Sequence, residues 1–400
     1  MIFGQHDEKT LEQFRAIQRR AVKAALMADG HAGYSMPIGG VAAYEDEVSV
    51  TGVGFDIACG NAAIRTDARL EDFTKEQQLQ QVANDIQRSI SFGVGRENRH
   101  DDPSLTEHRL FSADAWDAFP RDARAAEFKG LARAQLGTVG SGNHYVDVFA
   151  DERGYLWVGV HFGSRGLGHK TASGFLALAQ NRKWGDRVPE RETILPLRDS
   201  LGEAYWQLMQ LAGMYAYAGR EWVARKVVAI LGAGEQELVH NHHNFAWRET
   251  HDGKDVVVVR KGATPAFPDQ KGFVGGSMGD NAVILAGSPT PPDEAPAALF
   301  STVHGAGRVM SRTQARGKVK GWGKKARIVS PGLISPEMMK SWLDEKGVIL
   351  KGGGLDEAPQ AYRRLPDVLA AQGNTIKVLH ELRPLIVVMA GQDEFDPYKD

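Results

Sequence analysis

The chain has 400 residues, of which 42% are apolar, so it can bury a large core in one domain or in two closely joined ones. Its 48 basic and 50 acidic residues give a formal charge of −2, which excludes a general attraction to nucleic acid and leaves only a local patch for such binding. The single cysteine excludes an intrachain disulfide and indicates a reducing compartment. The first residues lack the apolar core of a signal peptide, and no apolar run approaches the ~20 residues of a membrane helix, so we expect a soluble cytoplasmic protein.

Hydrophobic periodicity predicts the elements of the first half of the chain. Apolar residues at helical spacing predict a first helix over residues 8–27. A second helix follows Thr74, where residues 74–77 have the form of a capping box. β-Branched and aromatic residues predict a strand over 155–162, and a long helix is expected over about 202–231, stopped by Gly232.

The second half is richer in strands. Short buried strands are predicted over 256–259, 282–286, 327–329 and 385–389, with helices over 336–346 and 357–371 and a proline-rich loop over 286–296. Helices and strands alternate without a regular βαβ rhythm, which favours an α+β fold over a doubly wound sheet. No linker composition separates domains, so residues 1–400 are expected to form one large mixed domain.

The lone cysteine, Cys59, follows Asp56 by three positions in a glycine-dense run that begins at Gly52. So much glycine predicts a turn in place of a helix, and a tight turn lets a carboxylate and a thiolate point into one small volume, where the sulfur can bridge two cations. The alternative is a buried cysteine beside a solvated aspartate, since free cysteine is often simply part of the core. Taken alone, the pair leaves both interpretations open.

Two glycine-rich segments downstream carry further ligand-type residues. Asn143, His144 and Asp147 follow three glycines and two small hydroxyl residues, a composition that lets backbone N–H groups approach an anion. A glycine-rich hairpin with a capping asparagine is the alternative, and it would not need the histidine and the aspartate. His161 leaves the predicted strand into a Gly-Ser-Arg-Gly loop, where Arg165 could bind phosphate oxygens.

Histidines recur at His240, His242 and His243, and at most one or two of them can face a given site. His243, with Asn244, is the best candidate, placed near the end of the long helical region, although spacing alone chooses weakly among the three.

His304 stands in the run His-Gly-Ala-Gly-Arg, so that backbone amides and the Arg308 guanidinium surround one imidazole. Such an imidazole could attack a phosphorus atom, or it could be a further metal ligand. A basic stretch follows directly, which is either a solvated face or a track for a nucleic-acid backbone. Its members are Arg308, Arg312, Arg316, Lys318, Lys320, Lys324, Lys325 and Arg327, with Trp322 among them.

Taken together, these segments resemble the RtcB-type RNA-splicing ligases. The matching stretches occur in the family's order and span roughly residues 27–391: they are 29–40, 56–59, 140–144, 161–169, 243–244, 260–264, 276–279 and 304–308. The resemblance implies GTP- and Mn²⁺-dependent joining of an RNA 3′-phosphate or 2′,3′-cyclic phosphate end to a 5′-hydroxyl end, in RNA splicing or repair. An archease-like activator is a possible further partner, and the physiological RNA is left open.

Residue by residue, the resemblance implies two manganese ions. Asp56, Cys59 and His144 would hold one, and Cys59 would bridge to a second that is held by His161 and His243. His304 would attack the α-phosphorus of GTP and carry GMP covalently. The nucleotide contacts would come from Asn143, Asp147, Ser277, Gly305, Ala306, Gly307 and Tyr362.

Three positions depart from the family pattern, all toward the base and sugar of the nucleotide. Asp147 replaces a glutamate, Ala282 replaces a serine, and the chain reads Met389-Ala390-Gly391 where the family ends in Lys-Gly. Losing a polar contact of this kind typically costs on the order of 1–3 kcal/mol. We therefore expect a smaller preference for GTP over ATP than the family shows.

Two other functions compete with ligation. A metal-dependent RNA-end phosphoesterase would need the metals and no nucleotide, and an RNA-binding paralogue would have weakened nucleotide transfer. The intact His304 and the five metal ligands argue against the paralogue, whereas the altered base contacts keep the phosphoesterase possible.

Overall fold

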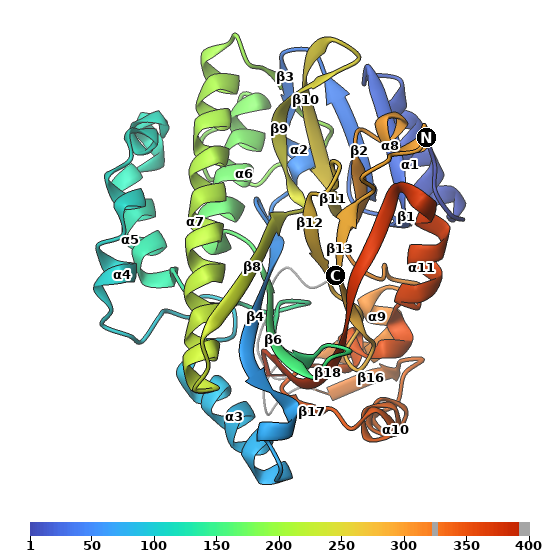
Figure 1. The fold of residues 1–400 in the computed structure, drawn as a ribbon. Coiled ribbons are helices and arrows are strands. Elements are labelled where there is room, and N and C mark those ends of the chain that lie inside the picture. The colour runs from blue at the N-terminus through green and yellow to red at the C-terminus, as the bar shows by residue number, and fades with distance from the viewer. Residues whose placement is uncertain (322–326, 392–400) are drawn as a thin grey trace.

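The largest sheet of the fold has eight strands (Figure 1), and Cys59, His144, His161 and His243 lie in its strands or directly next to a strand end. The structure is a computed structural model that describes residues 1–321 and 327–391. Along the sheet the strands are β12 (Lys271–Val274), β13 (Ala282–Gly287), β18 (Ile376–Met389), β5 (Tyr145–Ala150), β6 (Tyr155–Phe162), β4 (Gly60–Arg69) and β8 (Glu235–His242), while β17 (Ile349–Lys351) pairs with β18 off this path. Neighbouring strands are antiparallel except for β17 and β18.

The sheet curls until its two ends meet, so it is nearly closed. The Asn61 side chain of β4 donates to the Phe273 carbonyl of β12 at 2.8 Å, and the Phe273 N–H donates to the Asn241 side chain of β8 at 3.2 Å. Phe149 and Phe273 fill the interior, and a Cβ at Gly159 would lie 2.7 Å from both rings. Two asparagine amides thus satisfy backbone groups that an open edge would expose.

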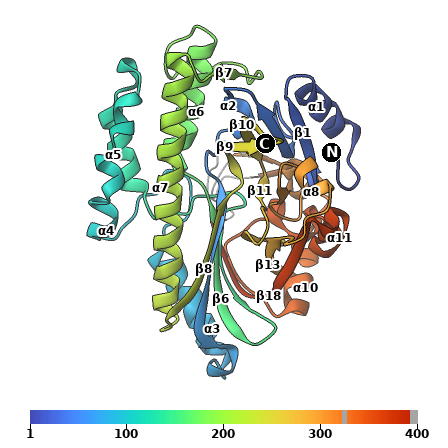
Figure 2. The same cartoon turned by 45° about the horizontal axis from the view of Figure 1, so that its top comes forward.

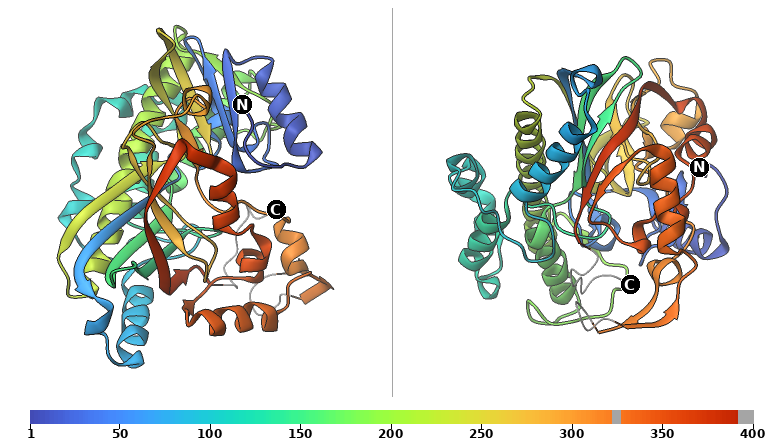
Figure 3. Two further views of the ribbon diagram at one scale, coloured as in Figure 1. Left: turned by 45° about the vertical axis from the view of Figure 1, so that its right-hand side comes forward. Right: turned by 90° about the horizontal axis from the view of Figure 1, so that it is seen from below.

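Helices cover one face of this sheet. The longest, α7 (Ser200–Ile230), packs on β4 and β6, α3 (Glu76–Ser89) packs on β17 and β18, and α6 (Arg165–Ala179) lies beside α7. Outside them are α4 (Pro103–Thr106) and α5 (Ala125–Gln135), as the right-hand view of Figure 3 shows.

A second sheet holds β1 (Lys23–His31), β2 (Ile38–Tyr44), β10 (Lys254–Lys261) and β9 (Asn244–His251), in that order. Against it pack α1 (Glu8–Gln18) and α11 (Leu365–Gln372), seen at the right of Figure 2. Only His243 separates β8 of the first sheet from β9 of the second, so the two sheets meet at that residue.

The remaining elements are short. Paired strands are β3 (Glu47–Ser49) with β7 (Ile194–Pro196), β11 (Ala263–Pro265) with β14 (Ser301–Val303), and β15 (Gly317–Lys320) with β16 (Arg327–Pro331). Short helices are α2 (Val50–Val53), α8 (Glu294–Ala297), α9 (Arg312–Arg316) and α10 (Pro336–Lys346).

The predicted α+β class is confirmed, with helices and strands mixed around one nearly closed sheet. The strand predicted over 155–162 and the helix predicted over 336–346 have those bounds, and the long helix runs from Ser200 to Ile230. Among the described residues, no helix is both long and apolar enough to cross a membrane.

The prediction of one helix over 8–27 is wrong, because α1 ends at Gln18 and the chain enters strand β1 at Lys23. Val22 is 52% exposed in the connecting turn. Residues 24–30 are buried on both faces of the strand, and such a continuous apolar run lacks the alternation that identifies a strand from sequence. Pairing with β2 therefore overrides the helix propensity of the alanine, leucine and methionine residues.

Glycine also misled the prediction at two places. The run after Ser164 is not a loop but the first turn of α6, and Gly52 lies inside α2. In α6 the glycines serve close packing, since a Cβ at Gly166 would lie 2.8 Å from the Gln135 side chain and one at Gly168 would lie 3.1 Å from Ile57.

Three smaller boundaries differ from the prediction. The helix after Thr74 is capped one residue later than expected, with the Lys75 N–H donating to the Gln78 side chain at 2.9 Å. Residues 357–364 form 3₁₀ turns and irregular chain, and α11 begins only at Leu365. His243 follows strand β8, not the end of the long helix.

Candidate metal centre

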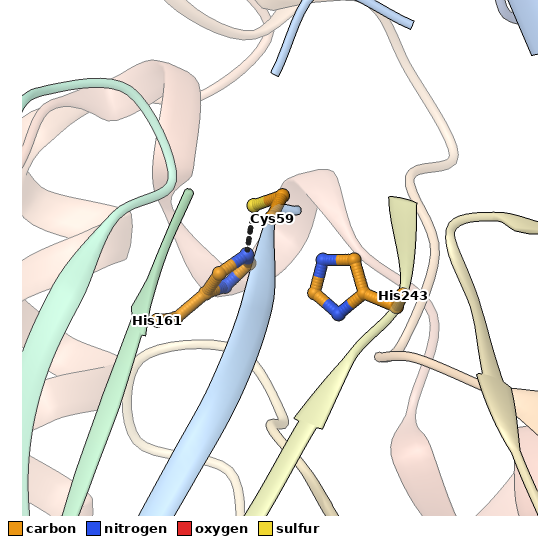
Figure 4. A group of neighbouring side chains, drawn as sticks. All are labelled: Cys59, His161 and His243. Atoms are coloured by element: carbon orange, nitrogen blue, oxygen red, sulfur yellow. Dashed lines mark hydrogen bonds between the residues drawn. The ribbon is translucent and has the colours of Figure 1, made fainter. Parts of the chain in front are cut away.

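Three neighbouring strands bring Cys59, His161 and His243 to one end of the nearly closed sheet. Gly60 of β4 pairs with Phe162 of β6 and with His242 of β8, so the residues next to these positions share one level. Figure 4 shows the three side chains converging, with the Cys59 Sγ 3.2 Å from the His161 Nε2. Their potential ligand atoms all lie within 4.8 Å of one another, and all three residues are buried.

A second group of ligand atoms shares the same sulfur. The His144 Nε2 lies 2.9 Å from the Asp56 Oδ2 and 3.7 Å from the Cys59 Sγ, and this group too fits within 4.8 Å. The His144 Nδ1 lies 2.9 Å from the Val139 carbonyl, which fixes the ring so that Nε2 faces the centre. The structure therefore assembles the two groups that the family resemblance implies, with Cys59 common to both.

Burial disfavours the protonated, charged form of the imidazoles at this centre. Burial, followed by the neighbouring histidines, holds the pKa of His161 and of His243 well below the usual range, so both rings are neutral. Burial and the nearby Asp56 raise the pKa of the Cys59 thiol. Burial alone would raise the pKa of Asp56, but His144 and Arg165 outweigh it, and the net shift is downward.

These residues fit a divalent transition-metal ion. Neutral imidazoles, a carboxylate and a thiol that can lose its proton to a metal form a mixed donor set that suits manganese or zinc better than magnesium. Among the described residues, the buried His243 Nδ1 has no hydrogen-bond partner, a cost that a bound ion would remove. A Cβ at position 163 would collide with the Asp56 carboxylate, so Gly163 keeps that ligand's space open.

One buried arginine on α7 holds the strand ends in register. The Arg220 guanidinium donates to the carbonyls of Ala58 and Phe162 at 2.8 and 2.6 Å. It also contacts the rings of His240 and His242, with N–N distances of 2.9 and 2.8 Å. Of the three clustered histidines, His240 and His242 thus contact Arg220, and His243 is the one that faces the candidate metal centre.

A histidine–aspartate pair stands next to the centre. The His304 Nδ1 lies 2.6 Å from the Asp29 Oδ2, and the rings of His304 and His243 are 4.8 Å apart. Asp29 is fully buried, and although burial raises the pKa of its carboxyl, His304 lowers it further, so the acid is ionised. Gly262, at φ +61°, lets the backbone pass the His304 ring, where a Cβ would lie 3.0 Å from Cε1.

Asp29 received no role from the sequence, although it opens the first stretch that resembles the family. The backbone N–H groups of His304 and Gly305 both donate to its Oδ2, at 3.0 and 3.2 Å. These two amides therefore hold the aspartate beside the His304 ring.

The residues predicted to contact the nucleotide differ in burial and in hydrogen bonding. Asn143 is exposed, Ala306 is buried, and the Gly307 carbonyl accepts from the Arg363 N–H at 2.9 Å. The Ser277 hydroxyl donates to Asp280 at 2.7 Å. These positions stay predictions, since only a bound nucleotide would test them.

Arg308 does not face His304, contrary to the expectation. It donates to the Tyr362 hydroxyl at 2.9 Å and to the Asp356 carbonyl at 2.7 Å, and it pairs with the buried Glu357. Arg312 forms ion pairs with the same two acids. Of the basic stretch, Trp322, Lys324 and Lys325 lie outside the described residues, while Lys318, Lys320 and Arg327 are exposed.

Comparisons with known proteins agree with this geometry. A family model described as "tRNA-splicing ligase RtcB" matches residues 11–390. The chain is 32% identical to the tRNA-splicing ligase RtcB of Archaeoglobus fulgidus, covering 91% of this chain and 87% of that protein. It is 29% identical to the RNA-splicing ligase RtcB of Escherichia coli K12 (91% and 89% covered) and 30% identical to the RNA-splicing ligase RtcB homolog 1 of Entamoeba histolytica (92% and 80% covered).

Fold, centre and similarity thus define an RNA ligase with a cluster of candidate metal-binding residues at one end of a nearly closed sheet. The chain belongs to the RtcB family of tRNA-splicing ligases.

Replacing Arg220 by methionine should destabilise the protein and loosen the centre together. Each of the two buried carbonyls left without a donor costs about 1–3 kcal/mol, so we expect a loss of about 2–6 kcal/mol in the free energy of unfolding. Metal affinity should fall about 10- to 100-fold, as for other groups that orient metal ligands. Chemical denaturation and Mn²⁺ titration measure the two effects.

The matched control for this variant is Arg225→Met on the same helix. Arg225 is half exposed and pairs with Glu221 and Glu235, so its loss should cost only about 0–1 kcal/mol and leave metal binding unchanged. Equal effects of the two substitutions would contradict the role given to Arg220.

The shared sulfur predicts a difference in metal content. Cys59→Ala should abolish binding of both ions, whereas Asp56→Asn should remove one and keep the group of Cys59, His161 and His243. Metal analysis after dialysis against Mn²⁺ measures this, with circular dichroism as the check on folding. Retention of one ion by Cys59→Ala would show that the sulfur does not bridge.

Proposed function

We propose that the protein joins RNA 3′-phosphate or 2′,3′-cyclic phosphate ends to 5′-hydroxyl ends, using GTP and Mn²⁺, through a GMP group carried on His304. The observation that carries the proposal is the His304–Asp29 pair beside the candidate centre that shares the Cys59 sulfur. An ionised carboxylate on Nδ1 leaves Nε2 as the nucleophilic nitrogen, the arrangement that activates histidine in other enzymes.

His304 and Asp29 account for the first step. Nε2 of His304 attacks the α-phosphorus of GTP, a P–N bond forms, and pyrophosphate leaves. Asp29, on Nδ1, holds the ring in place and stabilises the positive charge that develops on the imidazole. An oxygen of the RNA 3′-phosphate then takes the GMP from His304, and the 5′-hydroxyl oxygen displaces GMP as the phosphodiester forms. A cyclic phosphate is first opened by water to the 3′-phosphate.

Asp56, Cys59 and His144 would hold one ion, and Cys59, His161 and His243 the other. When bound, such cations neutralise phosphate charge and support in-line displacement. An RNA-end phosphoesterase needs this centre but gives no use to a buried carboxylate on His304, which favours the ligase.

Label transfer from α-³²P-GTP tests the intermediate. In Mn²⁺ the wild type should acquire an acid-labile, alkali-stable adduct, His304→Ala should acquire none, and Asp29→Asn should react about 10²- to 10⁴-fold more slowly. Retained RNA-end hydrolysis by His304→Ala, without any adduct on the wild type, would support the phosphoesterase instead.

The base side of the nucleotide site has an unusual acid. Burial raises the pKa of Asp147 well above its usual range, and its Oδ1 has no hydrogen-bond partner in residues 1–321 and 327–391. Asp147 pairs across the strands with Val387, two pairs away from Tyr145 and Met389, and the buried Tyr145 hydroxyl also has no hydrogen-bond partner within the described part of the chain. A neutral acid both donates and accepts, so it does not impose the hydrogen-bond pattern of guanine as a carboxylate would.

We therefore expect weak selection between GTP and ATP. ATP in excess should compete for adduct formation, and Asp147→Glu should increase the preference for GTP by up to about tenfold, worth about 1.4 kcal/mol. Competition with unlabelled nucleotides measures this. Strict use of GTP by the wild type would contradict the expectation.

A further inference from the structure

An arginine-lined cavity lies in the loop that follows α6. Its volume is about 610 Å³, and its lining includes Arg182, Arg187 and Arg191 with a single carboxylate, Asp186. That carboxylate already accepts from the Lys183 N–H at 3.1 Å, so it serves the loop's own backbone. Among the described residues, no carboxylate forms an ion pair with any of the three guanidinium groups.

The loop around the cavity is held in place at both ends. Trp184 packs edge-on against Phe175 and Phe128, with ring centroids 5.4 and 5.8 Å away. The Gln180 side chain donates to the Pro189 carbonyl at 3.0 Å, across the base of the loop. A held loop presents its arginines at lower entropic cost than a free one would.

A chain of contacts connects this loop with the metal centre. Phe55, next to the ligand Asp56, meets the Tyr34 ring at 6.4 Å, and the Ser35 hydroxyl donates to the Glu190 carbonyl at 3.4 Å. Tyr34 is 51% exposed, and the Lys261 ammonium lies 5.9 Å from its ring. Lys261 is buried, so the exposed Tyr34 ring is the part of this path that an RNA could contact between the centre and the cavity.

We propose that the cavity of Arg182, Arg187 and Arg191 binds the phosphodiester backbone of the substrate RNA, outside the joined ends. Guanidinium forks match phosphate oxygens, and an exposed aromatic between them and the reacting end offers a surface on which a base stacks. The inference rests on the proposed function, since it assigns a path to the same RNA. It also supplies the local cationic surface that the chain's charge of −2 requires.

Salt-dependent RNA binding tests this proposal. The variant is Arg182→Gln/Arg187→Gln/Arg191→Gln, and the control, Lys75→Gln/Arg153→Gln/Lys226→Gln, removes the same charge at the opposite ends of β4, β6 and β8. Single-stranded RNA with a 3′-phosphate is the probe, in two lengths: a dinucleotide and a longer oligonucleotide. GTP label transfer is measured on both proteins.

For the longer RNA, the slope of log affinity against log salt should fall by about 2, with about 10- to 100-fold weaker binding at 0.1 M salt. Dinucleotide binding and label transfer should be unchanged, as should every readout of the control. Unchanged binding of the longer RNA would overturn the proposal and leave an acidic protein as the fitting ligand. Absence of label transfer in the wild type would instead refute the proposed function, so the two failures are distinguishable.

Discussion

The site depends first on the hydrogen bonds of one buried guanidinium. Arg220 contacts Ala58, Phe162 and His242, and each of these residues is the chain neighbour of a metal-binding candidate. Although burial lowers its pKa to about 10, Arg220 remains charged at neutral pH. Helix α7 thus fixes the ends of three strands through the Arg220 side chain. The positions of these strand ends then determine how far apart the candidate metal ligands lie.

The residues that hold the site in position differ from the residues that would bind metal or react. His240 and His242 are neutral because burial lowers the pKa of each, to about 3 for His240, and they complete the shell of Arg220. Asp29 orients His304 in a similar way: it accepts from two backbone amides, and its Oδ2 lies 2.6 Å from the ring Nδ1. The candidate metal ligands and His304 are therefore both oriented by residues that need not touch the substrate.

The sequence predicted the candidate ligands of the site better than it predicted the supporting residues and the first strand. The ligand candidates were found because each stands in a glycine-rich segment of a recognisable order, as at Cys59 and His304. Arg220 gave no signal, since an arginine in an amphipathic helix is indistinguishable from an exposed one until the helix is placed. Strand β1 was missed because pairing with β2, a non-local contact, decided between helix and strand.

Glycine was the least transferable signal. Glycine occurs in an open turn near Asp56, at a close helix contact at Gly166, and where the backbone passes close to the His304 ring at Gly262. Composition alone cannot distinguish these uses, because each depends on which neighbour approaches. The mixed α+β class survived such errors because it requires only the number and alternation of elements.

The position of His243, alone between β8 and β9, has a thermodynamic consequence. An ion held there touches the joint between two sheets, so the free energy of its binding is also free energy of keeping the sheets together. An ion at 100 times its dissociation constant would add about 2.7 kcal/mol to folding. The supply of metal in the cell would then set how much folded ligase exists, as well as how fast it works.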